Sequence, residues 1–175
     1  HAGRHGLAAG VMLQPGAGRL LLGQDVSTVT DRHVELSDVL GSQVVTDVRA
    51  AMTDPQDPGC RREAADSLEA VIRAHLPLDD EGRLVNDLVD HIEHDPSVRQ
   101  VSQVCDRFGL SERALQRLTR RRLGLTPKWL IQRRRLHEAS ERLRAGPGDL
   151  AAIAHDLGYA DQAHFTRDFR RVTGI

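Results

Sequence analysis

The chain has 175 residues, of which 39% are hydrophobic, 28% are charged and only 3% are aromatic. No stretch approaches the roughly 20 consecutive apolar residues that a membrane helix needs, and no signal peptide is visible, so we expect a cytoplasmic protein without a membrane partner. The scarcity of aromatic residues, the many Ala, Leu and Arg residues and a repeated 3.6-residue periodicity predict a mainly α-helical fold.

The net charge of −1 conceals a strong asymmetry along the chain. Residues 1–97 carry 8 Arg and 17 Asp or Glu, whereas residues 98–175 carry 16 Lys or Arg and 8 Asp or Glu. A difference of this size is expected when one half faces phosphate and the other faces protein or solvent. Arg predominates among the basic residues and is the better bidentate ligand of phosphate and guanine, although a high-GC genome would produce the same bias.

Residues 1–41 contain short apolar runs at positions 11–13 and 19–23, separated by a Pro-Gly break. Short strands and one-turn helices both fit this pattern, so we expect a small N-terminal remnant that could contain β-structure. About forty residues cannot enclose a ligand pocket, and no effector site is predicted here. Because the chain does not begin with Met, we expect a fragment, a processed product or a sequence that lacks some residues.

Two amphipathic helices are predicted within residues 42–76. A turn with two prolines, at residues 53–59, ends the first helix. The predicted apolar faces comprise Val44, Val45, Val48, Ala51 and Met52 in the first helix and Ala64, Ala65, Leu68, Val71, Ile72 and His75 in the second. The two helices can pack as an antiparallel hairpin, whose role is either core packing or dimerisation.

The charged segment PLDDEG, residues 77–82, is the predicted linker, and a second domain is predicted over residues 83–175. Its first helix places Leu84, Leu88, Val89 and Ile92 on one face and ends near Asp95. His91 and His94 lie one helical turn apart in this helix. A third ligand at a supporting spacing is lacking, so no metal site is predicted.

The stretches 98–124 and 149–174 repeat one pattern: a helix, a turn that contains glycine, and a second helix with outward arginines. The matched positions are Val101, Val104, Cys105, Phe108 and Gly109 with Leu150, Ile153, Ala154, Leu157 and Gly158, and then, one residue further on, Leu115, Arg117, Arg120, Arg121 and Gly124 with Phe165, Arg167, Arg170, Arg171 and Gly174. Two helix-turn-helix units are therefore predicted, with Ser111 as an N-cap and Phe165, Phe169 and Val172 as an apolar stripe.

A long helix is predicted between the repeats, over residues 126–144. Thr126 is the expected N-cap and Pro127 takes the first helical position, while Gly146-Pro147-Gly148 ends the helix. Its expected buried positions are Trp129, Leu130, Leu136, Ala139 and Leu143. A helix of about 18 residues spans roughly 27 Å, which suits two recognition helices that enter major-groove segments about 34 Å apart.

The segments GLSERALQRLTRRRLGLTP and GYADQAHFTRDFRRVTG resemble the DNA-binding domain of AraC/XylS-type transcription regulators. The resemblance implies a sequence-specific regulator that binds double-stranded DNA, with RNA polymerase as a candidate partner and no cofactor. It also implies that the N-terminal half is the end of a sensor domain and a homodimer interface, whose small-molecule effector is unknown. The family continues past the final glycine, so we expect the C-terminal end to be truncated or disordered.

The predicted DNA contacts fall into two groups, because Arg and Gln match the base edges of guanine and adenine and other arginines match phosphate. Base contacts are expected from Arg113, Gln116, Arg117, Gln162, Ala163, Thr166 and Arg167. Phosphate contacts are expected from Arg120, Arg121, Arg133, Arg134, Arg170 and Arg171.

Two other classes of protein remain as alternatives to a DNA-binding regulator. The sequence has no nucleophile motif, no glycine-rich phosphate loop and no paired carboxylates in an apolar setting, so we do not expect an enzyme. A protein-interaction or antagonist module could keep the fold without binding DNA. The outward arginines in both repeats argue against it.

Overall fold

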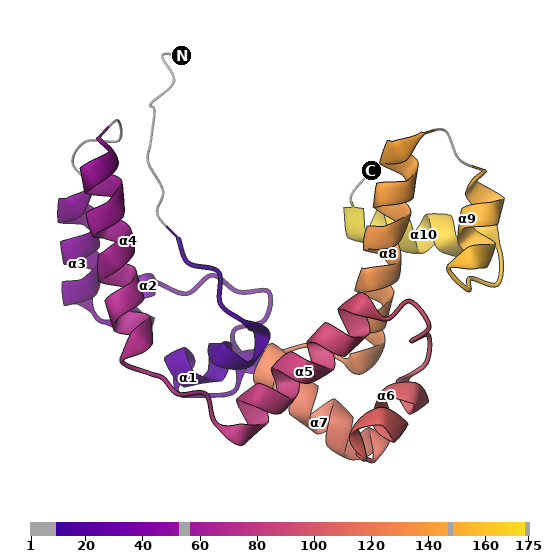
Figure 1. Cartoon of the computed structure of the whole chain (residues 1–175), viewed down its shortest axis with the longest axis horizontal. Coiled ribbons are helices and arrows are strands. Elements are labelled where there is room, and N and C mark those ends of the chain that lie inside the picture. The colour runs from indigo at the N-terminus through magenta and orange to yellow at the C-terminus, as the bar shows by residue number, and fades with distance from the viewer. Residues whose placement is uncertain (1–9, 53–56, 147–148, 174–175) are drawn as a thin grey trace. The chain divides into compact units, whose positions relative to one another are not determined.

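The computed structural model describes residues 10–52, 57–146 and 149–173, and within these ranges the chain forms helices and no strand. The elements in chain order are η1 (Pro15–Ala17), α1 (Gly18–Leu22), η2 (Val26–Thr28), α2 (Leu36–Leu40), α3 (Ser42–Ala51), α4 (Pro58–Arg73), α5 (Asp80–His94), α6 (Val101–Phe108), α7 (Glu112–Leu123), α8 (Pro127–Ala145), α9 (Leu150–Asp156) and α10 (Gln162–Thr173), where η marks a 3-10 helix (Figure 1). The mainly α prediction is confirmed. Of the two alternatives for the N-terminal remnant, its described part takes the helical one.

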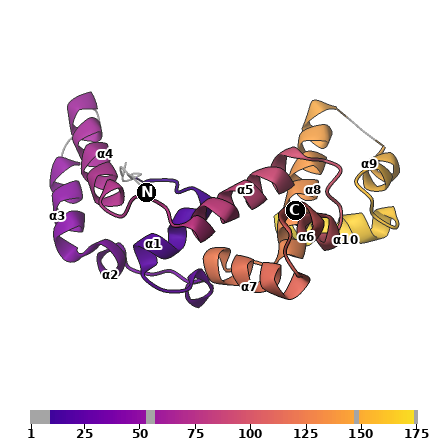
Figure 2. The ribbon, with the colours of Figure 1, turned by 60° about the horizontal axis from the view of Figure 1, so that its bottom comes forward.

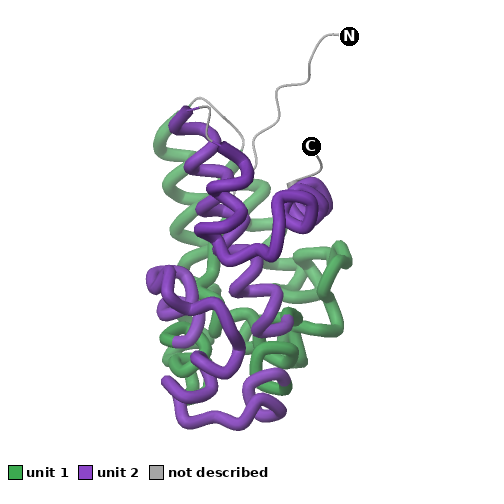
Figure 3. Tube along the Cα trace, turned by 90° about the vertical axis from the view of Figure 1, so that its right-hand side faces the viewer, with its two compact units in different colours: residues 1–87, 117–125 green, residues 88–116, 126–175 purple. Residues whose placement is uncertain are grey.

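The chain divides into two compact units, which are coloured separately in Figure 3. The first unit comprises residues 1–87 and 117–125, and the second comprises residues 88–116 and 126–175. Helices α5 and α7 therefore contribute residues to both units. The predicted linker at residues 77–82 does not coincide with this division.

The helical hairpin of the first unit forms as its amphipathic pattern predicts. Helices α3 and α4 lie side by side (Figures 1 and 2) and enclose a small core of Val48, Ala51, Ala64 and Leu68. Asp57 caps α4 by accepting a hydrogen bond from the Gly59 amide at 3.0 Å. Ala65 and His75 are exposed, although they were expected on the apolar face, and His75 lies beyond the end of α4 at Arg73. Part of the predicted turn, residues 53–56, lies outside the described ranges.

The N-terminal segment packs on α5 and on the end of α7 within the same unit. The Gly16 amide donates a hydrogen bond to Asn86 Oδ1 at 2.7 Å, and Asn86 Nδ2 donates to Gln14 Oε1 at 2.8 Å. The Gly16 position leaves no room for a side chain, since a β-carbon there would lie 2.1 Å from the Gly82 carbonyl oxygen. The short helix η1 is therefore held against α5 by hydrogen bonds to Asn86 and by the close approach of the Gly16 and Gly82 backbones.

Helix α5 begins at Asp80, so it includes residues that were predicted as linker. The cause is Asp79, whose carboxylate accepts a hydrogen bond from the Gly82 amide at 2.8 Å and caps the helix. Asp80 and Glu81 follow in the first turn, where negative charge is favourable to the helix dipole. The acidic run that resembles a linker in the sequence is thus a helix N-terminus.

The second unit has a core of side chains from α8, α9 and α10. Its buried members are Leu136, Ala139, Ile153, Ala154, Leu157, Tyr159 and Phe165. Thr126 caps α8 by accepting from the Trp129 amide at 3.2 Å, with Pro127 at the first helical position, as the sequence predicts. The 19 residues of α8 correspond to about 28 Å. The predicted stop of this helix includes residues 147–148, which lie outside the described ranges.

Some of the predicted core positions differ from the structure at the edges of the helices. Ile131 is buried in α8, whereas Trp129 and Leu143 are only half-buried. In α10, Phe165 is buried and Phe169 partly so, but Val172 is 44% exposed. Val172 lies near the end of the last helix, where the core no longer reaches, so its predicted burial is wrong.

Candidate nucleic-acid interface

Helix α7 combines a buried face with an exposed row of hydrogen-bonding side chains. It follows a turn at Gly109, which has a φ of 64°, and Ser111 caps it by accepting from the Ala114 amide at 3.2 Å. Leu115 and Leu118 are buried, at 0% and 6% exposure. The opposite face carries four exposed residues that share helical spacing, Arg113, Gln116, Arg117 and Arg120. Gln116 also donates a hydrogen bond to Glu112 at 3.0 Å.

Helix α10 repeats this design with smaller side chains. It follows the turn at Gly158, which has a φ of 75°, and the Asp161 carboxylate accepts from the His164 amide at 2.7 Å. Phe165 is 1% exposed and anchors the helix in the core of the second unit. The predicted base-contacting residues Gln162, Ala163 and Arg167 are exposed, whereas Thr166 is half-buried.

The arginines that are predicted to contact phosphate differ in their exposure and in the partners of their side chains. Arg120 and Arg170 are exposed. Arg171, whose side chain is 66% exposed, pairs with Asp168 at 3.2 Å on the same helix. The Arg133 side chain is 51% exposed and pairs with Glu93. Surface pairs of this kind contribute little to stability, so Arg133 and Arg171 can exchange their partners for a phosphate.

Two other predicted phosphate contacts are held inside the protein. The Arg134 side chain is only 9% exposed, and it donates to the Val98 carbonyl at 3.0 Å and to Glu138 at 3.2 Å. Arg121 is 29% exposed and donates to Glu81 at 2.5 Å. Both guanidinium groups are engaged within the fold, and a phosphate contact from Arg134 or Arg121 stays a prediction.

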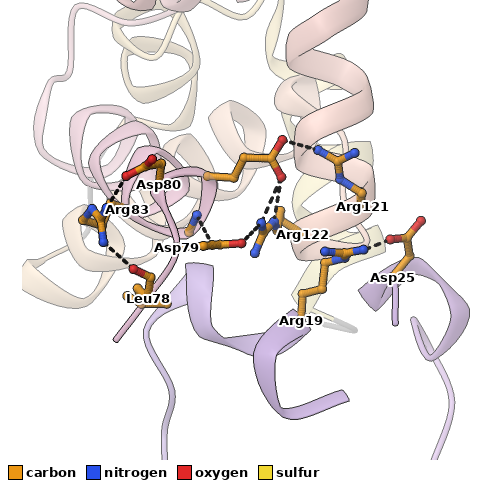
Figure 4. A network of polar contacts seen from close by, with 10 residues as sticks. Arg19, Asp25, Leu78, Asp79, Asp80, Arg83, Arg121 and Arg122 are labelled. Atoms are coloured by element: carbon orange, nitrogen blue, oxygen red, sulfur yellow. Dashed lines mark hydrogen bonds and ion pairs between the residues drawn. The ribbon is translucent and has the colours of Figure 1, made fainter. Parts of the chain in front are cut away.

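Arg122 is a buried charge that the sequence interpretation missed. It is 2% exposed and donates hydrogen bonds to Asp79 and, at 2.9 Å, to Glu81 (Figure 4). These hydrogen bonds hold the pKa values of both carboxyl groups below their ordinary values. The sequence contains an acidic run at 79–81 and a basic run at 120–122, which could have indicated this pairing. Helical periodicity, however, assigns Arg122 neither to the predicted buried face nor to the predicted outward face of its helix.

Groups of metal ligands are missing from the described part of the chain, since it contains no cluster of three or more His, Cys, Asp or Glu that could hold an ion. His91 packs edge-on against Phe108 with ring centroids 5.7 Å apart. His94 lies 2.9 Å from the Asp90 carbonyl oxygen. No helix in the described ranges is long and apolar enough to cross a membrane.

Comparison with known proteins finds similarity to helix-turn-helix proteins over the C-terminal part of the chain. Residues 104–175 match the family described as "Helix-turn-helix domain". The chain is 38% identical over 68 residues to the HTH-type transcriptional activator RhaS of Pectobacterium carotovorum, covering 39% of this chain and 24% of that protein. It is 41% identical over 71 residues to RhaS of Escherichia fergusonii, covering 41% of this chain and 26% of that protein.

The matched region has clear limits. The chain spans about a quarter of the length of the curated relatives it matches. No solved structure matches it. The match covers α7, α8, α9 and α10, which are the helices that carry all the predicted base contacts. Over this C-terminal part, the chain matches a helix-turn-helix domain and is similar to the transcriptional activators called RhaS.

Proposed function

We propose that this chain binds specific DNA sequences by inserting α7 and α10 into successive major-groove segments. The observation that carries the proposal is the exposed row on α7, where Arg113, Gln116, Arg117 and Arg120 share one helix face at spacings of three and four residues. A buried opposite face fixes this row on the fold. Arg can bind guanine O6 and N7 with two hydrogen bonds, and Gln can do the same with adenine N6 and N7.

Within this proposal α7 supplies more of the sequence discrimination than α10. Gln162 and Arg167 can hydrogen-bond to base edges, but Ala163 can contact only a thymine methyl group. Thr166 is half-buried, so its reach is short. Arg120, Arg133, Arg170 and Arg171 contact phosphates, which fix the position of the helices without reading sequence.

The whole protein is proposed to act in the cytoplasm, on nucleoid DNA, as a homodimer that recruits RNA polymerase. Activation is suggested by the names of the relatives, which are called transcriptional activators. Dimerisation through the N-terminal half is supported by apolar side chains that the first unit leaves exposed, among them Val34 at 50% and Leu76 at 53%. Val48 and Leu68 are unsuitable as interface residues, because they are buried between α3 and α4.

A gel-shift experiment with fragments of the organism's own genome tests the proposal. We expect a subset of fragments to be retarded at moderate salt. With four available phosphate contacts in place of the six predicted, log K should fall with log salt at a slope of about −3.6, by the rule of about 0.9 per phosphate. A chain that retards no fragment would instead be a protein-interaction module, and a slope near zero would contradict the electrostatic part of the proposal.

Light scattering tests the dimer separately. The double change Val34→Asp and Leu76→Asp should convert a dimeric parent into a monomer without unfolding the α3–α4 hairpin, since both side chains are about half exposed. A change of Val48 to Asp serves as the contrast, because it should unfold the hairpin instead. A mass that stays dimeric in the folded double variant would rule out this surface.

A further inference from the structure

A pocket of about 510 Å³ lies in the second unit, and its lining is rich in cations. The volume is within the range of roughly 300–1,000 Å³ that is typical of small-molecule sites. Its basic side chains are Arg99, Lys128, Arg135 and Arg171, and its one carboxylate is Asp168. Of these five residues, only Arg171 belongs to the DNA contacts proposed above.

Two guanidinium groups converge at the turn of the second helix-turn-helix unit. A β-carbon at Gly158 would lie 3.5 Å from Arg99 Nη1 and 3.8 Å from Arg135 Nη2. Arg99 also donates a hydrogen bond to the Asp156 carbonyl at 2.9 Å, which fixes its position. Two cations are therefore held against the same stretch of backbone, and among the described residues neither forms an ion pair with an acidic side chain.

Arg135 is the less satisfied of the two. Its Nε is buried and has no hydrogen-bond partner among the described residues. Burial lowers the pKa of this guanidinium, and the neighbouring Arg134 and Arg99 lower it further. Charges that are partly buried in proteins are normally paired, so a guanidinium that forms no ion pair among the described residues is suited to binding an anion.

Tyr159 provides a second unsatisfied group in the same lining. The residue is 6% exposed, and its ring lies under the Arg135 guanidinium at 4.1 Å. Its hydroxyl is buried without a hydrogen-bond partner in the described structure. Burial raises the pKa of this hydroxyl, so it stays protonated and can donate a hydrogen bond.

The carboxylate of Asp168 is already used by other residues. It accepts a hydrogen bond from Gln132 Nε2 at 2.5 Å and pairs with Arg171 at 3.2 Å. His164 lies 3.6 Å away from it. The charge of Asp168 also acts on Arg135, but among the described residues neither Arg99, Arg135 nor Lys128 forms an ion pair.

We propose that this pocket binds an oxyanion, a phosphate or carboxylate group, held by Arg99, Arg135 and Lys128 and by a hydrogen bond from the Tyr159 hydroxyl. Arg offers planar pairs of N–H donors that match the oxygen geometry of such a group. The oxyanion is carried either by a small metabolite or by the DNA backbone. Only the second source rests on the proposed function.

The first experiment measures thermal unfolding of the full chain in inorganic phosphate and in chloride at equal ionic strength. Phosphate also stabilises proteins without binding to a site. The comparison between variants therefore decides whether a rise in Tm comes from phosphate bound in the pocket. For the parent we expect a rise in Tm that saturates in the millimolar range. Arg135→Met and Lys128→Gln should lose this rise. Arg144→Gln, an exposed change on the same helix outside the pocket, should keep it.

The second experiment identifies the source of the oxyanion by measuring DNA binding against salt with the same variants. If the ligand is a backbone phosphate, Arg135→Met should flatten the slope of log K by about 0.9 and weaken all sequences alike. If the ligand is a small metabolite, the slope and the affinity should match those of the parent. Lys128→Gln keeps the test valid should Arg135→Met fail to fold.

The two experiments together can overturn the proposal. It is wrong if neither Arg135→Met nor Lys128→Gln alters the phosphate response or the salt slope. A parent that shows the phosphate response but binds no DNA would remove the proposed function and leave the oxyanion site standing. The failure of the proposed DNA binding is thus distinguishable from the failure of the proposed oxyanion site.

Discussion

The two helix-turn-helix units share a scaffold but differ in what their second helices expose. Of the predicted base contacts, α7 carries three long exposed side chains, Arg113, Gln116 and Arg117, whereas the four on α10 include Ala163 and a half-buried Thr166. The buried anchors correspond, with Leu115 at 0% and Phe165 at 1% exposure. The repeated pattern therefore determines the buried anchors and the arrangement of the helices. The exposed residues can differ between the two units, and with them the capacity of each helix to distinguish DNA sequences.

The ends of the two helices diverge further. At the offset of the repeat, Arg122 corresponds to Val172, yet the arginine is 2% exposed and the valine 44%. The polar residue is buried because Asp79 and Glu81 surround it, while the apolar residue lies beyond the reach of its core. Neighbours from elsewhere in the chain thus override the helical pattern at this position.

The largest expected effect is on the anchors that the repeats share. Phe165→Ala should lower the free energy of unfolding by about 3–5 kcal/mol, and Leu115→Ala by about 2–5 kcal/mol, because each leaves a cavity in a closed core. Urea denaturation followed by circular dichroism measures both. If either costs less than about 1 kcal/mol, the corresponding repeat lacks the packing described here.

The next effect separates Arg122 from Val172. Arg122→Ala should lower the free energy of unfolding by about 2–3 kcal/mol, somewhat less than the ~3–5 kcal/mol for a fully buried pair, since its partners Asp79 and Glu81 are 46% and 45% exposed. Val172→Ala is the matched control at the equivalent position and should change it by no more than about 0.5 kcal/mol. Equal effects in the same denaturation assay would show that the two positions are alike after all.

The third prediction tests whether α7 discriminates sequence more strongly than α10. Arg117→Ala should cost about 1–3 kcal/mol on the best site and relax the preference at one base pair, and Arg167→Ala should do so to a smaller extent. Arg117→Lys keeps the charge but loses the planar pair of donors, so it should also relax the preference. Competitive binding to a library of single-base variants measures all three. Uniform weakening across the library would make Arg117 a phosphate contact.

A smaller effect is expected at the start of each recognition helix. Ser111→Ala and Asp161→Ala each remove a side chain that accepts a hydrogen bond from the first turn, at 3.2 Å and 2.7 Å respectively. Each should lower the free energy of unfolding by about 1 kcal/mol. Glycine at the same positions should cost less than alanine, and the reverse order in the denaturation assay would argue against a capping role.

The smallest effect is a pH dependence of stability that arises from the contacts of Arg122 with Asp79 and Glu81. The pKa values of Asp79 and Glu81 are lowered in the folded state by hydrogen bonds from Arg122, so their stabilisation is complete above the unfolded pKa values and is lost as pH falls from about 4 downward. The parent should therefore lose more of its Tm between pH 5 and pH 3 than Arg122→Ala does, on the order of a few degrees. Equal losses of Tm in the parent and in Arg122→Ala would show that Arg122 does not lower the pKa values of these two carboxyl groups.

The helical scaffold was predictable because its signals are local. Ser111 and Thr126 cap helices, Gly109 and Gly158 take positive φ values, and both features are visible in the sequence. The exposure of Arg113, Arg117 and Arg167 followed from spacing alone. These signals need no knowledge of the partners in space.

The features that the sequence did not predict depend on contacts between residues that are distant in the chain. Arg134 looks like its neighbour Arg133 in the sequence, yet only Arg134 is held by the Val98 carbonyl. The oxyanion pocket gathers Arg99, Arg135 and Tyr159 from three separate segments, and no periodicity connects them. The start of α5 was mistaken for a linker because Asp79 serves equally well in a charged break and in a cap.

The close approach of Gly16 to Gly82 has a consequence for how this chain can vary. The obstruction at Gly16 is backbone and cannot rotate aside, whereas Gly10 has nothing within 4 Å of an added β-carbon. In a saturation library screened for folded protein, position 10 should accept nearly any residue and position 16 only glycine. Substitutions would then accumulate over evolution at position 10 but not at position 16. A segment to which no functional site is assigned would still keep one invariant glycine.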